Sequence, residues 1–383
     1  MKNKGNTMKV AYCTGFWCTN VGNGFFSMGV EYALKKCLGE KNVTVVSDFQ
    51  TYTTSYGKRL YPDKKQLEYI SALDVDHIVL AGPVISKYFI CLWKDILLKL
   101  KRRGIGYIIL SAGKMKMNDA ACRDIKGFFT ECPPYAFSSR DETVYNEFGG
   151  YATHSYNGIC FSFFTPDCYA PAEMKTLSPY VVYNFDKISE PEIWKDTETN
   201  KASVQRFEFQ GQSYKIAYPR LLTALSAKTD RFTDALIYVE SLLPAQRRSD
   251  QMGEYKIIRT DHRFHPHFRG KIYRQNNSFV ADLPYGYLNL YANAELTLSD
   301  RVHACAATLA FGHSAMLFAK TDRLGLLGRV GAKDICDHPV RLDMELLMEE
   351  KRKQINWLRQ VLCSSANDSV KEEQVVDIQE GRF

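Results

Sequence analysis

Arg301 and His303 are the two residues whose types and spacing best suit chemistry on an anion. They lie two positions apart in the polar stretch 299–303, between a short, partly apolar segment (294–298) and a run of small apolar residues (304–311). The planar guanidinium of an arginine pairs with a carboxylate or phosphate through two parallel hydrogen bonds. An imidazole exchanges a proton near neutral pH. The pair therefore predicts a site that binds an anion and moves a proton.

The segments around this pair indicate how it is held. Residues 294–298 predict a buried strand, 299–303 a polar elbow, and 304–311 a helix that Gly312 ends before a further strand at 315–319. In an open α/β sheet, ligands bind outside the carboxyl ends of strands, and a helix N-terminus in that place attracts anions. The same pattern also fits an arginine at a sheet edge with a histidine in the core, so both interpretations stay open.

A second group of candidates lies at 261–267, where His262, His265 and His267 accompany Arg263. A metal site is disfavoured, because a proline interrupts the group and no cysteine or glutamate lies nearby. A loop that faces an anion is the preferred interpretation, and a solvated loop is the alternative.

Two basic residues follow the strand predicted at 315–319. Lys320 and Arg323 would hold a phosphate together with Arg301. The alternative is that they only begin a solvated helix.

Arg140 and Asp141 follow a brief predicted strand at 135–137. Asp141 would cap the helix that it precedes, and Arg140 would contact either a ligand or a neighbouring carboxylate. Ser111 and Lys114 have the Ser-x-x-Lys spacing of acylating serine enzymes, but the companion motifs are missing.

The composition limits the class of protein. The chain has 383 residues, 45% of them hydrophobic and 24% charged, with a net charge of +7, which suits a globular protein of two domains. It has no dense basic run with interleaved aromatics, so nucleic acid is not favoured as a partner. The 11 cysteines include no Cys-x-x-Cys pair, and several, such as Cys91, Cys160 and Cys305, lie in apolar runs, which indicates buried, reduced thiols and a cytoplasmic location. No stretch is apolar enough to span a bilayer, so membrane contact would be at most peripheral.

Strands and helices alternate along the chain, which predicts an α/β fold with parallel sheets covered on both faces. The polar residues that follow successive strands would line one edge of each sheet. Region 205–217 would form a short hairpin or an irregular insertion. The predicted strands are 8–14, 43–46, 76–81, 107–110, 135–137, 180–184, 255–259, 294–298 and 315–319, and the predicted helices are 25–38, 94–102, 142–148, 219–225, 231–242, 304–311 and 344–362.

Proline-containing loops near residues 166–178 predict a boundary between two α/β halves. We therefore expect an N-terminal domain at 1–172, a C-terminal domain at 173–343, and a C-terminal helix with a polar tail at 344–383. A cleft between two domains is the usual place for a ligand.

The chain resembles the polysaccharide pyruvyl transferase family in the order of four motifs. The most specific is Ser-Asp-Arg-Val-His-Ala (299–304), which is similar to the family's Arg-x-His signature with its downstream glycine (Gly312) and lysine (Lys320). Three weaker matches accompany it: Asn20-Val-Gly-Asn-Gly24 to an Asn-x-Gly-Asp/Asn loop, Ser139-Arg-Asp-Glu142 to an Arg-Asp-Glu turn with Thr165-Pro-Asp167 after it, and Ala81-Gly-Pro83 to a turn usually written Gly-Gly-Gly. The last match and the insertion-like region 185–225 depart from the family pattern.

The resemblance implies two Rossmann-like domains facing a cleft, as in B-type glycosyltransferases. The donor would be phosphoenolpyruvate as co-substrate, with no other cofactor and no metal. The acceptor would be a sugar or lipid-linked oligosaccharide of a cell-surface polysaccharide, and the products a cyclic pyruvate ketal and phosphate. Arg301 would hold the donor and His303 would act as general acid or base. The implied donor-binding residues are Arg301, His262, Arg263, Lys320 and Arg323 in the C-terminal domain, and the implied acceptor-side residues are Asn20, Asn23, Gly24 and Arg140 in the N-terminal domain.

Two other functions fit the same sequence. One is a B-type glycosyltransferase that uses a nucleotide sugar, although the chain shows no obvious carboxylate pair for it. The other is a sugar- or anion-binding relative without catalysis, against which the presence of both Arg301 and His303 argues.

Overall fold

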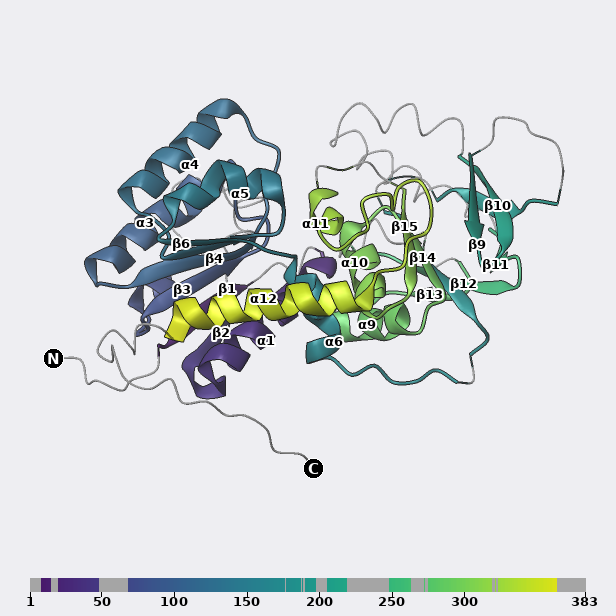
Figure 1. Cartoon of the computed structure of the whole chain (residues 1–383), viewed down its shortest axis with the longest axis horizontal. Coiled ribbons are helices and arrows are strands. Elements are labelled where there is room, and N and C mark those ends of the chain that lie inside the picture. The colour runs from purple at the N-terminus through teal and green to yellow at the C-terminus, as the bar shows by residue number, and fades with distance from the viewer. Residues whose placement is uncertain are drawn as a thin grey trace, which may run out of the picture.

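The computed structural model shows two α/β halves side by side, with a long C-terminal helix that runs from one to the other (Figure 1). It describes residues 8–14, 20–47, 68–175, 177–186, 188, 190–197, 205–218, 248–262, 272, 275–318, 321 and 323–363. Each half is built on a six-stranded, largely parallel sheet. The predicted α/β class with two Rossmann-like domains is therefore confirmed.

The sheet of the N-terminal half is parallel throughout, in the order β2-β1-β3-β4-β5-β6. Its strands are β1 (Val10–Thr14), β2 (Val43–Ser47), β3 (His77–Ala81), β4 (Gly106–Ala112), β5 (Ala136–Ser139) and β6 (His154–Asn157), and its helices are α1 (Gly22–Leu38), α3 (Phe89–Arg102), α4 (Asp119–Glu131) and α5 (Glu142–Phe148). Successive residues of a strand point to opposite faces. Accordingly, Val10 and Tyr12 of β1 pack in the core that contains α1, whereas Ala11 and Cys13 pack in the core that contains α3 and α4.

The sheet of the C-terminal half has the order β11-β12-β7-β14-β15, with β13 beside β12. Its strands are β7 (Tyr180–Asn184), β11 (Gln251–Met252), β12 (Tyr255–Thr260), β13 (Ser278–Phe279), β14 (Leu296–Ser299) and β15 (Ser314–Leu317), and its helices are α9 (Pro284–Ala292), α10 (Val302–Ala310) and α11 (Gly325–Gly328). Strands β12, β7, β14 and β15 are parallel. Their carboxyl ends therefore lie along one edge of the sheet.

Among the described residues, one face of this second sheet is covered by strands. The strands β8 (Glu192–Lys195), β9 (Gln205–Phe209) and β10 (Gln212–Ala217) form an antiparallel sheet, whose Phe207 and Tyr214 share a core with Val181 and Tyr183 of β7. The turn between β9 and β10 has positive φ at both central residues, Gln210 (48°) and Gly211 (73°), which matches a tight hairpin. The hairpin alternative for region 205–217 is thus confirmed.

The C-terminal helix α12 (Met344–Cys363) is fastened to the N-terminal half as well as to its own. The side-chain amide of Gln354 accepts the backbone N–H of Ile159 (2.7 Å) and donates to its carbonyl (3.2 Å). Tyr156 of β6 stacks on Trp357 with ring centroids 5.2 Å apart. The Tyr135 hydroxyl also donates to the Val361 carbonyl. Together these contacts hold the two halves in one arrangement.

Several helices begin earlier than the apolar pattern predicts. Helix α1 begins at Gly22 instead of residue 25, α3 at Phe89 instead of residue 94, and α10 at Val302 instead of residue 304. The first turn of a helix needs no apolar face of its own, which explains the late predicted start of α1, whose first three residues are Gly-Asn-Gly. This reason does not hold for α3, whose first five residues are apolar. Helices α4 and α9 were not expected. The helices predicted at 219–225 and 231–242 lie outside the described residues.

The cysteine prediction holds in part. Cys160 and Cys305 are buried free thiols, as predicted, but Cys91 is exposed on α3, because it falls on the solvent side of that helix. Within the described part of the chain, no helix is both long and apolar enough to cross a membrane.

The contact between α1 and the short 3₁₀ helix Phe161–Phe164 predicts opposite effects of two Gly→Ala substitutions. A Cβ at Gly29 of α1 would lie 2.0 Å from the Phe161 carbonyl oxygen, whereas a Cβ at Gly127 of α4 would meet nothing within 4 Å. Gly29→Ala should therefore destabilise the fold by about 1–3 kcal/mol through overpacking. Gly127→Ala, the matched control, should stabilise it by roughly 0.5–1 kcal/mol. Urea unfolding measures both, and a Gly29→Ala variant as stable as the wild type would contradict the described packing.

Candidate active site at the junction of the two halves

The turn between β14 and α10 is fixed by hydrogen bonds of its own residues. The Ser299 hydroxyl accepts the backbone N–H of Arg301 (2.9 Å) and donates to the Asn184 carbonyl at the end of β7 (3.0 Å). Arg301 is the N-cap of α10, and its side chain makes no cap hydrogen bond. The start of α10, with its free N–H groups and positive dipole end, therefore lies at the carboxyl edge of the sheet, as predicted.

Arg301 is buried, with 7% of its surface exposed. Its Nε atom pairs with the carboxylate of Asp186, and the Asp300 carboxylate lies 3.9 Å away. Burial opposes the charge, but Asp186 and then Asp300 outweigh it and raise the pKa of Arg301. The Nη2 atom has no hydrogen-bond partner among the described residues. One end of the guanidinium is thus fixed, and the other can bind a ligand.

His303 lies in the first turn of α10, not in the turn before it as the sequence suggested. It is 5% exposed, and its ring packs 5.5 Å from the ring of Phe26 in α1. Its Nε2 atom is buried without a hydrogen-bond partner in the described part of the chain. A buried polar atom without a partner is costly unless a ligand or water completes it.

The surroundings of His303 disfavour its charged form. Burial, and after it the positive charges of Arg140, Arg323, His262 and Arg301, lower the pKa of His303 well below its ordinary value. The imidazole is therefore neutral near pH 7. It is ready to accept a hydrogen bond or a proton, and added negative charge beside it would raise its pKa.

Arg140 reaches this site from the other half of the molecule. It follows β5, is 2% exposed, and holds its guanidinium over the same Phe26 ring at 5.9 Å. The Nη1 atom lies 4.0 Å from the Cys160 thiol, and none of the described carboxylates forms an ion pair with it. The neighbouring Asp141 carboxylate interacts with it electrostatically, but a buried charge that lacks an ion-paired partner is expensive. Arg140 and His303, which come from different halves, thus both pack against the ring of Phe26.

Asp141, next to Arg140, caps α5 as predicted, because its side chain accepts the Val144 N–H at 2.9 Å. A Cβ at Gly325 of α11 would lie 2.9 Å from the Asp141 Cβ. The segment after β15 therefore contacts the N-terminal half, and Arg323 in it acts electrostatically on His303.

His262 connects the N-terminal loop to the C-terminal half. Its carbonyl accepts the Val21 N–H (2.9 Å), and its Nε2 lies 2.6 Å from the buried Tyr291 hydroxyl, which also accepts from the Asn184 amide (2.9 Å). A Cβ at Gly22 would lie 2.6 Å from the His262 Nδ1. Only glycine fits this approach, so the imidazole is already engaged in joining the two halves.

The N-terminal loop therefore meets His262, one of the residues predicted for the donor. Asn20 accepts the Gly22 N–H (3.0 Å), and Asn23 and Gly24 are buried in the first turn of α1. The Oδ1 atom of Asn23 has no partner among the described residues. Arg263, His265, His267 and Lys320 lie outside the described residues, so their predicted roles, and the metal interpretation of 261–267, stay untested.

Three residues of the site were not singled out from the sequence. Asp186 and Asp300 hold Arg301, and Phe26 supports both Arg140 and His303. Asp186 lies two residues after the end of β7. The other candidates were chosen because they are polar residues that follow a predicted strand, so the same signal could have found Asp186. Phe26 had none beyond its place in an amphipathic helix.

The two Rossmann-like domains, which meet at this junction, have the fold of B-type glycosyltransferases. A family model described as "Polysaccharide pyruvyl transferase" matches residues 20–319, a stretch that contains Arg140, Arg301 and His303. The chain belongs to this family. No curated protein matches it significantly.

Solved structures of similar arrangement include three epimerases. One is a putative UDP-N-acetylglucosamine 2-epimerase from Listeria monocytogenes, with 8% identity, 94% of this chain and 91% of that chain covered, and a TM-score of 0.47. The second is the UDP-GlcNAc 2-epimerase from Neisseria meningitidis bound to UDP-GlcNAc, with 10% identity, 94% of each chain covered, and a TM-score of 0.43. The third is the UDP-GlcNAc 2-epimerase from Methanocaldococcus jannaschii in complex with UDP-GlcNAc and UDP, with 12% identity, 91% of this chain and 93% of that chain covered, and a TM-score of 0.44. At TM-scores below 0.5, these likenesses carry no argument about function.

The neutral state of His303 predicts how stability depends on pH. Below about pH 6.5 the unfolded chain protonates this imidazole while the folded chain does not, so the folded state loses stability as the pH falls towards the lowered pKa. The loss from this group is at most about 1.4 kcal/mol per pH unit. His303→Gln should remove it, which urea unfolding at about pH 7.5 and about pH 5.5 measures. His154→Gln, at an exposed histidine of β6, should keep the wild-type slope, and an equal slope in His303→Gln would contradict the buried, neutral imidazole.

Proposed function

We propose that the chain moves the enolpyruvyl group of phosphoenolpyruvate onto two hydroxyl groups of one sugar in a cell-surface polysaccharide or its precursor. The product is a cyclic pyruvate ketal, and inorganic phosphate is released. Family membership supports the transferase class. The observation that carries the proposal is the meeting of Arg140, Arg301 and His303 at one junction, where Arg301 Nη2 and His303 Nε2 lack hydrogen-bond partners among the described residues.

The donor carries two anionic groups, a phosphate and a carboxylate, and the site offers two buried guanidinium groups from opposite halves. In the proposal, Arg301 holds one anionic group together with the N–H groups at the start of α10, and Arg140 holds the other. Arg323 adds positive charge nearby, and Arg263 and Lys320 are further proposed donor ligands. The donor would thus give Arg140 an ion-pair partner.

His303 handles the proton in this scheme. When the anionic donor binds, it offsets the arginine charges that lower the pKa of His303, so the imidazole takes up a proton and becomes an acid. It then protonates the methylene carbon of the donor, which becomes a methyl group, while the first sugar hydroxyl adds to the neighbouring carbon and gives up its proton. The second hydroxyl displaces phosphate, which leaves with one proton. Atoms balance without a metal or a further cofactor.

The acceptor would approach from the N-terminal half. Sugar hydroxyls need hydrogen-bond acceptors, and the Asn23 Oδ1, unpartnered within the described residues, lies at the start of α1, next to the Gly22 that packs against His262. We therefore propose Asn20, Asn23 and Gly24 as the acceptor-side boundary of the site.

The test is phosphate release from phosphoenolpyruvate in the presence of cell-surface glycan precursors. His303→Ala should lower the rate at least about 100-fold, the usual size of a lost acid or base, while circular dichroism shows an intact fold. The matched control is His313→Ala, at a partly buried histidine that directly precedes β15; this variant should keep wild-type activity.

Three outcomes would count against the proposal. A folded His303→Ala variant with undiminished ketal formation would remove His303 from the chemistry. Thermal stabilisation by nucleotide sugars but not by phosphoenolpyruvate would favour the glycosyltransferase alternative. Binding of phosphoenolpyruvate without phosphate release with any glycan precursor tried would favour a non-catalytic binder.

A further inference from the structure

Arg301 is oriented by a loop that leaves the end of β7. Asp186 in this loop pairs with the Arg301 Nε. Asp300, which is 1% exposed, accepts the backbone N–H groups of Asp186 (3.1 Å) and Ile188 (2.8 Å). The Asp300 carboxylate thus fixes the backbone of the loop, and the Asp186 carboxylate in the loop binds Arg301.

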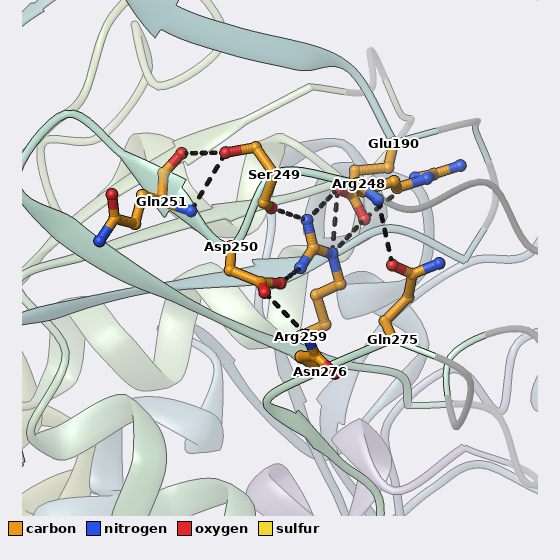
Figure 2. A network of polar contacts seen from close by, with 8 residues as sticks. All are labelled: Glu190, Arg248, Ser249, Asp250, Gln251, Arg259, Gln275 and Asn276. Atoms are coloured by element: carbon orange, nitrogen blue, oxygen red, sulfur yellow. Dashed lines mark hydrogen bonds and ion pairs between the residues drawn. The ribbon is translucent and has the colours of Figure 1, made fainter.

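The far end of the same loop is held by a separate ionic network (Figure 2). Glu190 accepts hydrogen bonds from Arg259 Nε (3.1 Å) and Nη2 (3.0 Å), and the Arg248 Nη1 lies 3.0 Å from it. Arg259 is 3% exposed, and it also donates to the Ser249 carbonyl (2.6 Å) and to Asp250 (3.5 Å). Because Arg259 binds Glu190 through two hydrogen bonds, the pair fixes the orientation of the Glu190 carboxylate as well as neutralising its charge.

We propose that Glu190 is a positioning residue for the anion site: by fastening the loop to Arg259 of β12, it sets Asp186 and leaves the Arg301 Nη2 directed at the ligand. The identity of that ligand as phosphoenolpyruvate rests on the proposed function. Glu190 itself does not contact Arg301, so it acts through the loop alone.

The reasoning depends on where the two ends of the loop are anchored. Strand β7 lies between β12 and β14, so a loop that leaves its end is free to turn towards either neighbour. Asp300 draws residues 186 and 188 towards β14, and Arg259 draws residue 190 towards β12. Without the second anchor, Asp186 would keep its bond to Arg301 but lose its fixed position, and ordering it again would reduce the affinity for the anion.

The competing explanation is that Glu190 only stabilises the fold. A variant of Asp196 serves as the control that distinguishes this explanation from a positioning role. Asp196 is also a partly buried carboxylate that holds two cations, Arg206 Nε at 2.7 Å and Lys215 Nζ at 2.8 Å. It lies just after β8, in the antiparallel sheet, and does not belong to the loop of Asp186. Loss of either carboxylate takes an ion-pair partner from a buried cation, Arg259 or Lys215, and should lower the melting temperature.

The experiment titrates phosphoenolpyruvate into the wild type, Glu190→Gln, Glu190→Asp and Asp196→Asn by calorimetry, with melting temperatures measured in parallel. Glu190→Gln should raise the Kd about tenfold, the smallest effect typical of losing an outer partner of a binding residue. Glu190→Asp, which keeps the charge, should recover part of the affinity. Asp196→Asn should melt earlier than the wild type but change the Kd less than about twofold.

An unchanged Kd in folded Glu190→Gln would overturn the inference and leave the proposed function standing. If Glu190→Gln fails to fold, an unchanged Kd in Glu190→Asp decides in the same way. If the wild type binds inorganic phosphate but not phosphoenolpyruvate, the proposed donor is wrong, and the same variants are compared with phosphate. If the wild type binds neither anion, both proposals fail.

Discussion

Positive charge buried between the two halves is the constraint on which the rest of this site depends. Taking a guanidinium out of water without a counter-charge costs several kcal/mol, and Arg140 is 2% exposed with no ion-paired carboxylate in the described part of the chain. The cost is tolerable because a bound anion would supply the missing charge. Burial, and after it the same positive charges, lower the pKa of His303 and keep its imidazole neutral.

The fold provides this arrangement by bringing together two helix starts. The first turn of α1 enters the core of the C-terminal half, where Val21 and Phe25 pack with Tyr287 and Tyr291. The first turn of α10 carries His303, which packs against Phe26 of α1, as Arg140 also does. Helix α12 fastens both halves from outside (Figure 1). The site is therefore a property of the junction, and neither half contains it alone.

Local sequence patterns predicted the parts of this site but not their assembly. The strand, turn and helix around Arg301 were readable because apolar periodicity and polar strand ends are local signals, and the cap at Asp141 was readable for the same reason. That Arg140 and His303 meet over Phe26 was not readable, because it depends on how two distant halves pack. The roles of Asp186 and Glu190 were missed likewise, since each partner lies more than 60 positions away along the chain.

The most direct test of the central claim is the proton balance of donor binding. Phosphoenolpyruvate is titrated calorimetrically near neutral pH into the wild type and into His303→Gln, each in two buffers of different ionisation enthalpy. The difference between the two proteins removes any proton exchange by the donor itself. The account predicts that the wild type takes up more protons than the variant, up to one per site, because the bound anion raises the pKa of His303. Equal proton balance in the two proteins, or no binding at all, would contradict it.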